Sequence, residues 1–206
     1  VDLAQLSQCR SIDEVISGLK GTIYYSPLES LRQKGQAVLP ACETAVDMLY
    51  FKTVWKIKEK YLSGQEKKDL TQCFGTRMDM LNLQWICRAK KYYHLPEGEI
   101  YAMIIPISLH LKKTEIRAMA QAEDVEQVYA LIRNSWYGRL DLGNLEKGQS
   151  LEEPCREVID RIYELTSRKE PYSASVLNSY LYFKEREIEK IITTIERIRY
   201  GVAAGI

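Results

Sequence analysis

Two carboxylates, Asp79 and Glu187, stand at matching places before long stretches rich in apolar residues and are the first candidates for acid/base chemistry. A pair of acidic side chains in one cleft can serve as general acid and general base. Acidic residues are also favoured in the first turn of a helix, where the helix dipole stabilises negative charge. We predict that each begins a long helix and has a structural role. Asn82, one turn after Asp79, is expected to tie helices together by hydrogen bonds.

Metal and thiol chemistry have little support in the sequence. The two histidines, His94 and His110, lack a second histidine four residues away, which is the spacing of a metal site on one helix face. We therefore predict surface or structural histidines and no metal ligand. The five cysteines form no Cys-x-x-Cys pair, which argues against a zinc ribbon, a dithiol redox centre or a disulfide framework and favours a reducing, cytosolic compartment. They are Cys9, Cys42, Cys73, Cys87 and Cys155.

Signals for phosphate and nucleic-acid binding are weak. Gly18-x-x-Gly21 lacks the Lys-Ser/Thr pair of a phosphate-binding loop, so we interpret it as the end of a helix. Arg88, Lys90 and Lys91 form a basic cluster beside two tyrosines, but acidic residues interrupt the positive charge elsewhere. Nucleic-acid binders concentrate basic residues on one face. We predict a solvated or protein-contacting surface, with no cofactor, no nucleic acid and no small-molecule substrate.

The bulk composition agrees with an ordinary globular protein. The 206 residues are 46% hydrophobic and carry a net charge of +1, from 29 Lys+Arg and 28 Asp+Glu. A spanning helix needs about 20 predominantly apolar residues. The longest apolar patch, residues 100–111, is interrupted by Pro106 and His110. The sequence therefore predicts no direct insertion into lipid.

The elements that position these side chains are predicted to be helices. Apolar residues recur at helical spacing in two segments, each surrounded by Lys, Glu and Arg. This pattern indicates helices with one solvent-exposed face. The two sets are Val46, Leu49, Tyr50, Val54 and Ile57, and Ile188, Ile191, Ile192, Ile195 and Ile198. Residues 100–108 lack the alternation of a strand and contain Pro106, so we interpret them as a buried helix end followed by a turn. The predicted fold class is all-α.

Local signals mark where some of these helices begin. Ser11-x-x-Glu14 and Ser150-x-x-Glu153 both match the capping box, in which a serine and a glutamate satisfy the first free N–H groups of a helix. Pro96, followed by a glutamate, suits the first turn of another helix.

Three blocks of the sequence recur in the same order. The pairs are residues 14–25 with 126–137, 42–50 with 155–163, and 79–92 with 187–200, at offsets of 112, 113 and 108 residues. A period of about 110 residues is too long for helix-pair solenoids, whose units are about 34–47 residues. We expect one all-α unit over 1–206 with two pseudo-repeats, 11–118 and 123–206, each a small helical bundle.

Aromatic residues recur at the ends of the first of these blocks. Tyr24 and Tyr25 correspond to Trp136 and Tyr137. We predict that they pack between helices, although exposed tyrosine and tryptophan are also common anchors of protein interfaces.

Three motifs along the chain resemble the central-stalk socket protein of A/V-type rotary ATPases, which is the C subunit of archaeal-type and the d subunit of vacuolar-type complexes. Asp79-Met-Leu-Asn82-Leu, continuing to Arg88-Ala-Lys90, is similar to that family's D-x-x-N-L…R-x-K helix. The segments 105–106 and 131–138 are similar to its I-P…L-x-x-T-x-Y-G pattern, and the segment 182–201 to its closing helix.

The resemblance implies a non-catalytic protein and part of a funnel of three helical lobes. This funnel sits on the membrane rotor ring, on the cytoplasmic side, and receives the foot of the central shaft, so that torque passes between ATP turnover and ion movement. Because the family has three repeats, the resemblance also implies that roughly its opening third is absent from these 206 residues. A free-standing helical adaptor with the same duplication remains the alternative.

Overall fold

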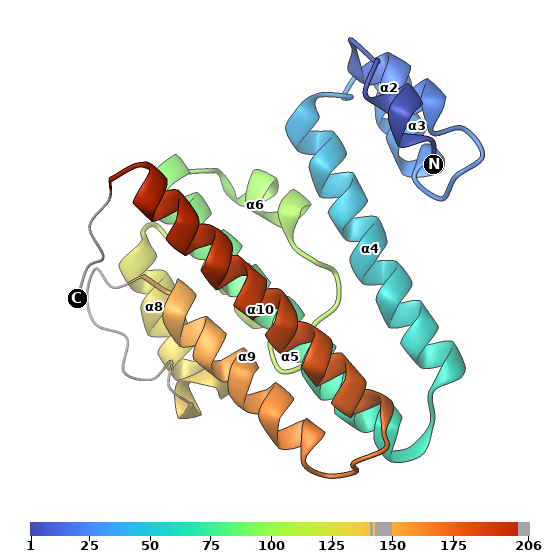
Figure 1. Cartoon of the computed structure of the whole chain (residues 1–206). Coiled ribbons are helices and arrows are strands. Elements are labelled where there is room, and N and C mark those ends of the chain that lie inside the picture. Colours follow the sequence, from blue (N-terminus) through green and yellow to red (C-terminus); the bar gives the residue numbers. More distant parts are fainter. Residues whose placement is uncertain (141, 143–149, 202–206) are drawn as a thin grey trace.

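The computed structural model describes residues 1–140, 142 and 150–201, which are mostly helical with no strand among them (Figure 1). The predicted all-α class is confirmed. The helices are α1 (Leu3–Leu6), α2 (Ile12–Gly18), α3 (Tyr25–Gln33), α4 (Leu39–Tyr61), α5 (Gly64–Arg88), the π-helix η1 (Ala89–Tyr93), α6 (Glu97–Met103), α7 (Lys113–Gln121), α8 (Val125–Asn134), the 3-10 helix η2 (Trp136–Arg139), α9 (Glu152–Ser167) and α10 (Ala174–Arg199).

The first three helices form a small N-terminal lobe at one end of α4 (Figure 1). Ser11 caps α2 as predicted, because its hydroxyl accepts the Glu14 N–H at 3.2 Å. The Glu14 carboxylate in turn accepts the N–H of Arg10 at 2.8 Å. Helix α2 ends at Gly18, which confirms the interpretation of the glycine pair as a helix end. The lobe has its own apolar core around Ile16, Leu19, Leu28 and Cys42.

Helix α5 is the centre of the main body. It contacts α4, α6, α8, α9 and α10, and twelve of its residues are buried. The main core extends from α5 to the helices around it, through residues such as Leu83, Ile100, Met119, Ile132 and Val158. A helix surrounded on all sides must bury polar as well as apolar positions, and each buried polar group then needs a hydrogen-bond partner.

Two predicted helix starts have different outcomes. Pro96 precedes α6 directly as its N-cap, so the predicted start there is confirmed. The predicted capping box at Ser150 is wrong, because α9 starts one residue later than that motif requires and has Leu151 as its N-cap. Glu153 is then the second helical residue, and the Ser150 hydroxyl accepts the N–H of Glu152 at 3.3 Å.

The apolar segment after α6 crosses the central helix as an extended strap. Helix α6 ends at Met103, and Ile100 and Ile105 are 0% and 1% exposed. The predicted helix end is therefore confirmed, but the predicted turn is wrong, because the chain continues from Ile104 as an extended segment with bends. We call residues 104–112 the strap, because they connect α6 to α7 and pack on α5.

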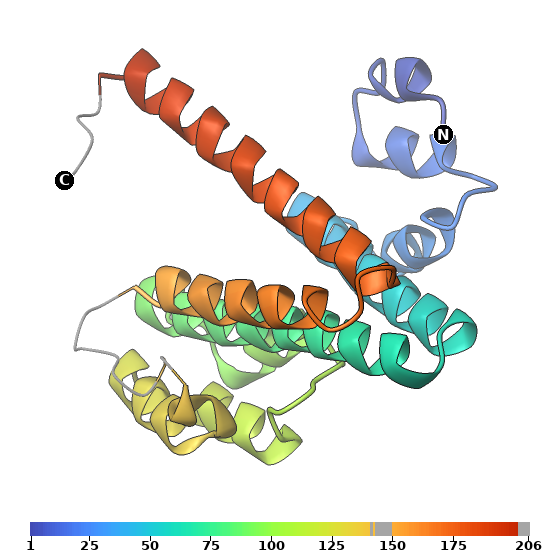
Figure 2. The same cartoon turned by 60° about the horizontal axis from the view of Figure 1, so that its bottom comes forward.

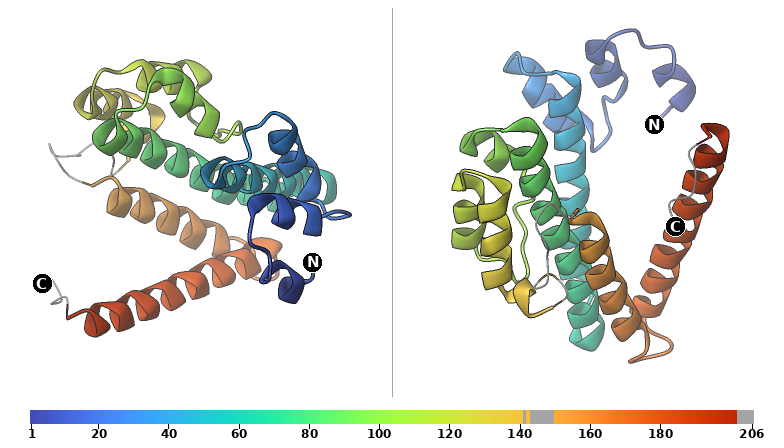
Figure 3. Two further views of the ribbon diagram at one scale, coloured as in Figure 1. Left: turned by 90° about the horizontal axis from the view of Figure 1, so that it is seen from above. Right: turned by 90° about the vertical axis from the view of Figure 1, so that its left-hand side faces the viewer.

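Helix α10 leaves the body along its length. It contacts α5 and α9, and Figures 2 and 3 show it diverging from both toward its carboxyl end. Its buried residues, Ser175, Ser179 and Tyr182, all lie in its first half. The second half of α10 is therefore a helix without a neighbour in the described part of the chain.

Candidate functional site

Asp79 lies in the middle of α5 and is completely buried. Its carboxylate accepts backbone N–H groups of three consecutive strap residues, with distances of 2.8 Å from His110, 3.1 Å from Leu109 and 3.2 Å from Leu111. The Tyr137 hydroxyl, from η2, donates to the same carboxylate at 2.8 Å. One side chain thus joins α5, the strap and η2.

The electrostatics of this cluster favour a structural role for it. Burial raises the pKa of Asp79, although the surrounding donors oppose that shift. Burial also raises the pKa of Tyr137 far above its ordinary value, with the Asp79 charge as the next cause. Tyr137 therefore remains protonated and donates its hydrogen bond at every physiological pH. Because the carboxylate is 0% exposed and saturated with donors, no substrate reaches it.

The structure does not bring the two predicted carboxylates together. Glu187 is exposed on α10 and pairs with Lys184 at 2.6 Å. The prediction that each acid begins a helix is wrong, since α5 begins at Gly64 and α10 at Ala174. The helix dipole therefore does not explain the position of Asp79 or of Glu187. Asp79 instead supplies acceptors to strap N–H groups that would otherwise be buried without partners.

Asn82 has the role that the sequence predicts for it. Its side-chain Oδ1 accepts the N–H of Ile105 at 2.8 Å, and its Nδ2 donates to the Ile105 carbonyl at 3.1 Å. Asn82 and Asp79 lie one turn apart on α5, so the two side chains fix both ends of the strap on the same helix face.

The histidines have structural surroundings. His110 stacks on Trp136 with ring centroids 3.7 Å apart, and burial lowers its pKa. His94 is exposed and ends η1 in the left-handed conformation, with φ of 50°. No group of three or more histidine, cysteine or acidic side chains in the described residues is arranged to hold a metal ion.

The predicted basic cluster lies at the end of α5 and in η1. Arg88 pairs with Glu152 at the start of α9, and Lys91 lies over the Tyr92 ring at 5.4 Å. The helix that carries Arg88 begins at Gly64, fifteen residues before the predicted start. Arg88 therefore links the end of α5 to the start of α9.

The predicted packing role of the recurring aromatic residues is confirmed. Tyr24 and Tyr25 pack on the core of the N-terminal lobe, and Trp136 and Tyr137 on the main core. Tyr137 is completely buried. The ring of Trp136 also meets that of Tyr137 edge-on, with centroids 5.0 Å apart.

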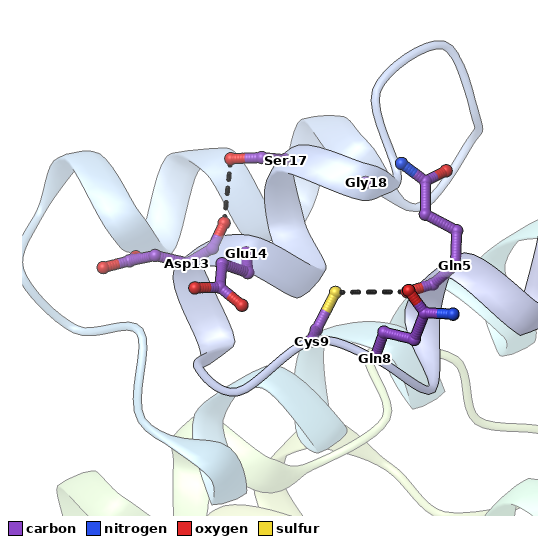
Figure 4. A pocket seen from close by; sticks show the side chains of 7 residues that line it. All are labelled: Gln5, Gln8, Cys9, Asp13, Glu14, Ser17 and Gly18. Atoms are coloured by element: carbon purple, nitrogen blue, oxygen red, sulfur yellow. Dashed lines mark hydrogen bonds between the residues drawn. The ribbon is translucent and has the colours of Figure 1, made fainter.

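A hollow of about 500 Å³ opens beside α2 in the N-terminal lobe (Figure 4). Its polar side chains form hydrogen bonds with the nearby backbone. Glu14 accepts the N–H of Arg10, and the Ser17 hydroxyl donates to the Asp13 carbonyl at 2.8 Å. Cys9, also in its wall, donates weakly to the Gln5 carbonyl at 3.7 Å. These contacts give the hollow no reactive group that is aimed at a ligand.

The feature that the sequence reasoning missed is a groove between α4 and α10. Its volume is about 700 Å³, and its apolar lining includes Tyr50 and Val54 from α4, Phe74 from α5, and Leu181 and Ile188 from α10. The apolar stripes predicted on α4 and α10 are thus real helix faces. The stripe on α10 is open to solvent, whereas on α4 only Tyr50 and Ile57 are exposed and the other three residues are partly buried. Their spacing was visible in the sequence, whereas their exposure was not.

The described residues thus form an all-α body with a saturated buried cluster around Asp79 and an apolar groove between α4 and α10. This chain belongs to the ATP synthase (C/AC39) subunit family, which matches residues 1–205.

Named relatives agree with this assignment. The C subunit of the A-type ATP synthase of Pyrococcus abyssi is 26% identical over 205 residues, covering 96% of this chain and 54% of the relative. The corresponding protein of Pyrococcus horikoshii is 27% identical over 193 residues, covering 89% and 50%. That of Methanobrevibacter smithii is 24% identical over 206 residues, covering 95% and 53%. The chain spans about half the length of the curated relatives it matches.

Among the described residues, no helix is both long enough and apolar enough to cross a bilayer.

Proposed function

We propose that this chain is a non-catalytic rotor-coupling element of an A/V-type rotary ATPase. It links the central shaft to the membrane rotor ring and transmits torque for ion transport or ATP synthesis, as a peripheral component on the cytoplasmic side. The observation that carries the proposal is the match over residues 1–205 to a family whose named relatives are A-type ATP synthase subunits.

The candidate chemical groups support a mechanical role. Asp79 and Asn82 use their side chains to fix the strap, and Glu187 is a solvated residue in an ion pair. A part that transmits torque must resist deformation, and well-packed interiors with satisfied polar groups have low compressibility. Helix α5, with contacts on all sides, gives the body that stiffness.

The order of the helices supports the two pseudo-repeats at 11–118 and 123–206. Helices α2, α4 and α5 of the first correspond in order to α8, α9 and α10 of the second. The connection before α9 includes residues 141 and 143–149, which lie outside the described residues. In this proposal each repeat contributes one lobe to a funnel around the shaft.

A binding experiment with purified components tests the proposal. The chain is mixed with the central-shaft proteins, and separately with the detergent-solubilised rotor ring, of the A-type enzyme from the same organism. Complexes are then separated by size-exclusion chromatography. We expect co-elution with the shaft, the ring or both, and no co-elution of an unrelated helical protein of equal size. Failure to bind either component would contradict the proposal and favour a free-standing adaptor.

A further inference from the structure

A pocket of about 440 Å³ lies where the strap passes from α6 to α7. The inner part of its lining is apolar and comprises Ile104, Ile105 and Ile116, of which the last two are buried. Tyr101 of α6 and Pro106 of the strap complete the apolar wall. The volume falls in the range of ligand pockets, about 300–1,000 Å³. We call this cavity the strap pocket.

Both ends of the strap are fixed by side chains of α5, and the pocket lies against the span between them. Asn82 holds the backbone of Ile105 through two hydrogen bonds, and Asp79 holds residues 109–111. The span between these points, residues 106–108, supplies part of the pocket wall. An extended segment that is fixed at both ends keeps its shape before a ligand arrives. Such a preorganised site loses less conformational entropy when it binds.

The rim of the strap pocket is positively charged. Lys113 and Arg117 lie four residues apart on α7, so both side chains are on one face of the helix. No acidic side chain among the described residues lines the pocket. Within the same part of the chain Lys113 forms no ion pair, and Arg117 has a long contact of 3.9 Å with Glu97, in which both side chains are exposed. An exposed pair of this kind contributes little, so the two cations remain available to a ligand.

The wall of the pocket also contains a hydroxyl group. Ser108 is half-buried, and its hydroxyl forms no hydrogen bond with any of the described residues. Binding pockets usually combine an apolar lining with a few polar groups that orient the ligand. Ser108 is such a group in the strap pocket.

The strap pocket is separate from the open face of α10. Helices α6 and α7 lie on the opposite side of α5 from α10 (Figure 3). The residues that line the pocket all belong to one continuous stretch of chain, from Tyr101 to Arg117. The walls of the pocket therefore do not depend on what covers α10.

We propose that the strap pocket docks an acidic segment of another subunit of the rotary ATPase. One apolar side chain of that segment enters the pocket, and a carboxylate beside it pairs with Lys113 and Arg117. Charge complementarity supports this occupant, since the rim attracts an anion while the buried apolar lining accepts an uncharged side chain. The Ser108 hydroxyl donates to the backbone of the segment. This inference rests on the proposed function, and adds where a partner binds and which chemistry it presents.

Charge reversal tests the docking. Lys113→Glu together with Arg117→Glu changes the rim from two positive to two negative charges. Lys52→Glu together with Lys56→Glu makes the same change at two exposed lysines of α4 with the same spacing, and is the matched control. Titration calorimetry measures the affinity for the shaft or the ring component, whichever the wild type binds. We expect at least about 10-fold weaker binding for the pocket variant and less than about 2-fold for the control. Circular dichroism verifies that both variants remain helical.

NMR of isoleucine methyl groups locates the contact. When the partner binds, the signals of Ile104, Ile105 and Ile116 should shift or broaden, and that of Ile16, in the core of the N-terminal lobe, should not. Tyr101→Ala removes the exposed aromatic wall of the pocket and leaves its charges in place. We expect this variant to bind the partner at least about 5-fold more weakly.

The outcomes separate this inference from the proposed function. If the wild type binds the shaft or the ring and the pocket variant binds as tightly as the control, the docking is overturned and the proposed function stands. The same holds if the three isoleucine signals do not change. Decanoate, an apolar chain with one carboxylate, is the probe for a small-molecule occupant. Shifts with decanoate alone, together with unchanged partner binding by the pocket variant, would assign the pocket to a small amphiphilic anion and overturn the docking. A wild type that binds neither component contradicts the proposed function and this inference with it.

Discussion

Replacing Asn82 with leucine removes both hydrogen bonds that fix Ile105, and with it the strap, on α5. Leucine has nearly the same shape as asparagine, so the change leaves little cavity and isolates the polar contribution. The Ile105 N–H and carbonyl then remain buried, since Ile105 is 1% exposed. Each buried polar group without a partner costs about 1–3 kcal/mol. We expect Asn82→Leu to lower the free energy of unfolding by about 3 kcal/mol.

The variant Asn82→Asp makes the same interaction dependent on pH. A protonated aspartic acid has one donor and one acceptor and can replace the amide against Ile105, whereas the carboxylate has no donor for the Ile105 carbonyl and adds a charge one turn from Asp79. The folded state therefore raises the pKa of the new carboxyl above that of an unfolded chain. Stability is then fully present below the unfolded pKa and is lost as the pH rises through the folded pKa.

Urea denaturation followed by circular dichroism, at several pH values from 4 to 8, measures both effects against the wild type. Asn134→Asp, at the exposed end of α8, is the matched control. It changes the free energy of unfolding by less than about 1 kcal/mol at any pH. A loss below about 1 kcal/mol for Asn82→Leu would refute this account of the strap. So would an Asn82→Asp variant whose loss, relative to the wild type, is the same at pH 4 and pH 8.

Three further outcomes are expected. Tyr137→Phe removes the hydroxyl that donates to Asp79 at 2.8 Å, and should lower the urea-derived free energy of unfolding by about 1–2 kcal/mol; an unchanged value would contradict the role of that hydrogen bond. Gly138→Ala would place a methyl group 1.8 Å from a backbone carbonyl oxygen of the preceding turn and should cost about 3 kcal/mol or more. Gly98→Ala, with open space around it, should instead stabilise the protein by about 0.5 kcal/mol in the same assay. An aromatic disulfide reagent at pH 8 should modify one thiol rapidly, and Cys9→Ser should abolish that phase; a second rapid thiol would show that the core is more open than described. Burial raises the pKa of the other four thiols, Cys42, Cys73, Cys87 and Cys155.

Much of the helical framework could be predicted from the sequence because its signals are local. Apolar residues at helical spacing identify α4 and α10, and Ser11 identifies the start of α2. The role of Asn82 was also predictable, since an amide beside an apolar stripe needs hydrogen-bond partners.

The position of Asp79 was not predictable from the same kind of signal. The first turns of α5, from Gly64 onward, are mostly polar, so the apolar pattern begins well inside the helix. Asp79 stands just before this apolar pattern, so in the sequence it resembles an acidic residue at the start of a helix. Its real surroundings come from the strap and η2, which lie about 30 and 58 residues further along the chain. No local pattern specifies such contacts.

The exposed apolar face of α10 shows a different limit of sequence reasoning. Amphipathic spacing indicates that one face of a helix is buried against another element. It does not indicate whether that element belongs to the same chain. A helix packed on a globular core usually shows a broad apolar face, whereas sustained steps of three and four residues are typical of pairing with another helix. On α10 the apolar steps of three and four residues are interrupted at Lys184, and Ile192 widens the face beside Ile191 and Ile195. The spacing alone therefore predicted an apolar face on α10, and only the structure shows that this face has no cover among the described residues.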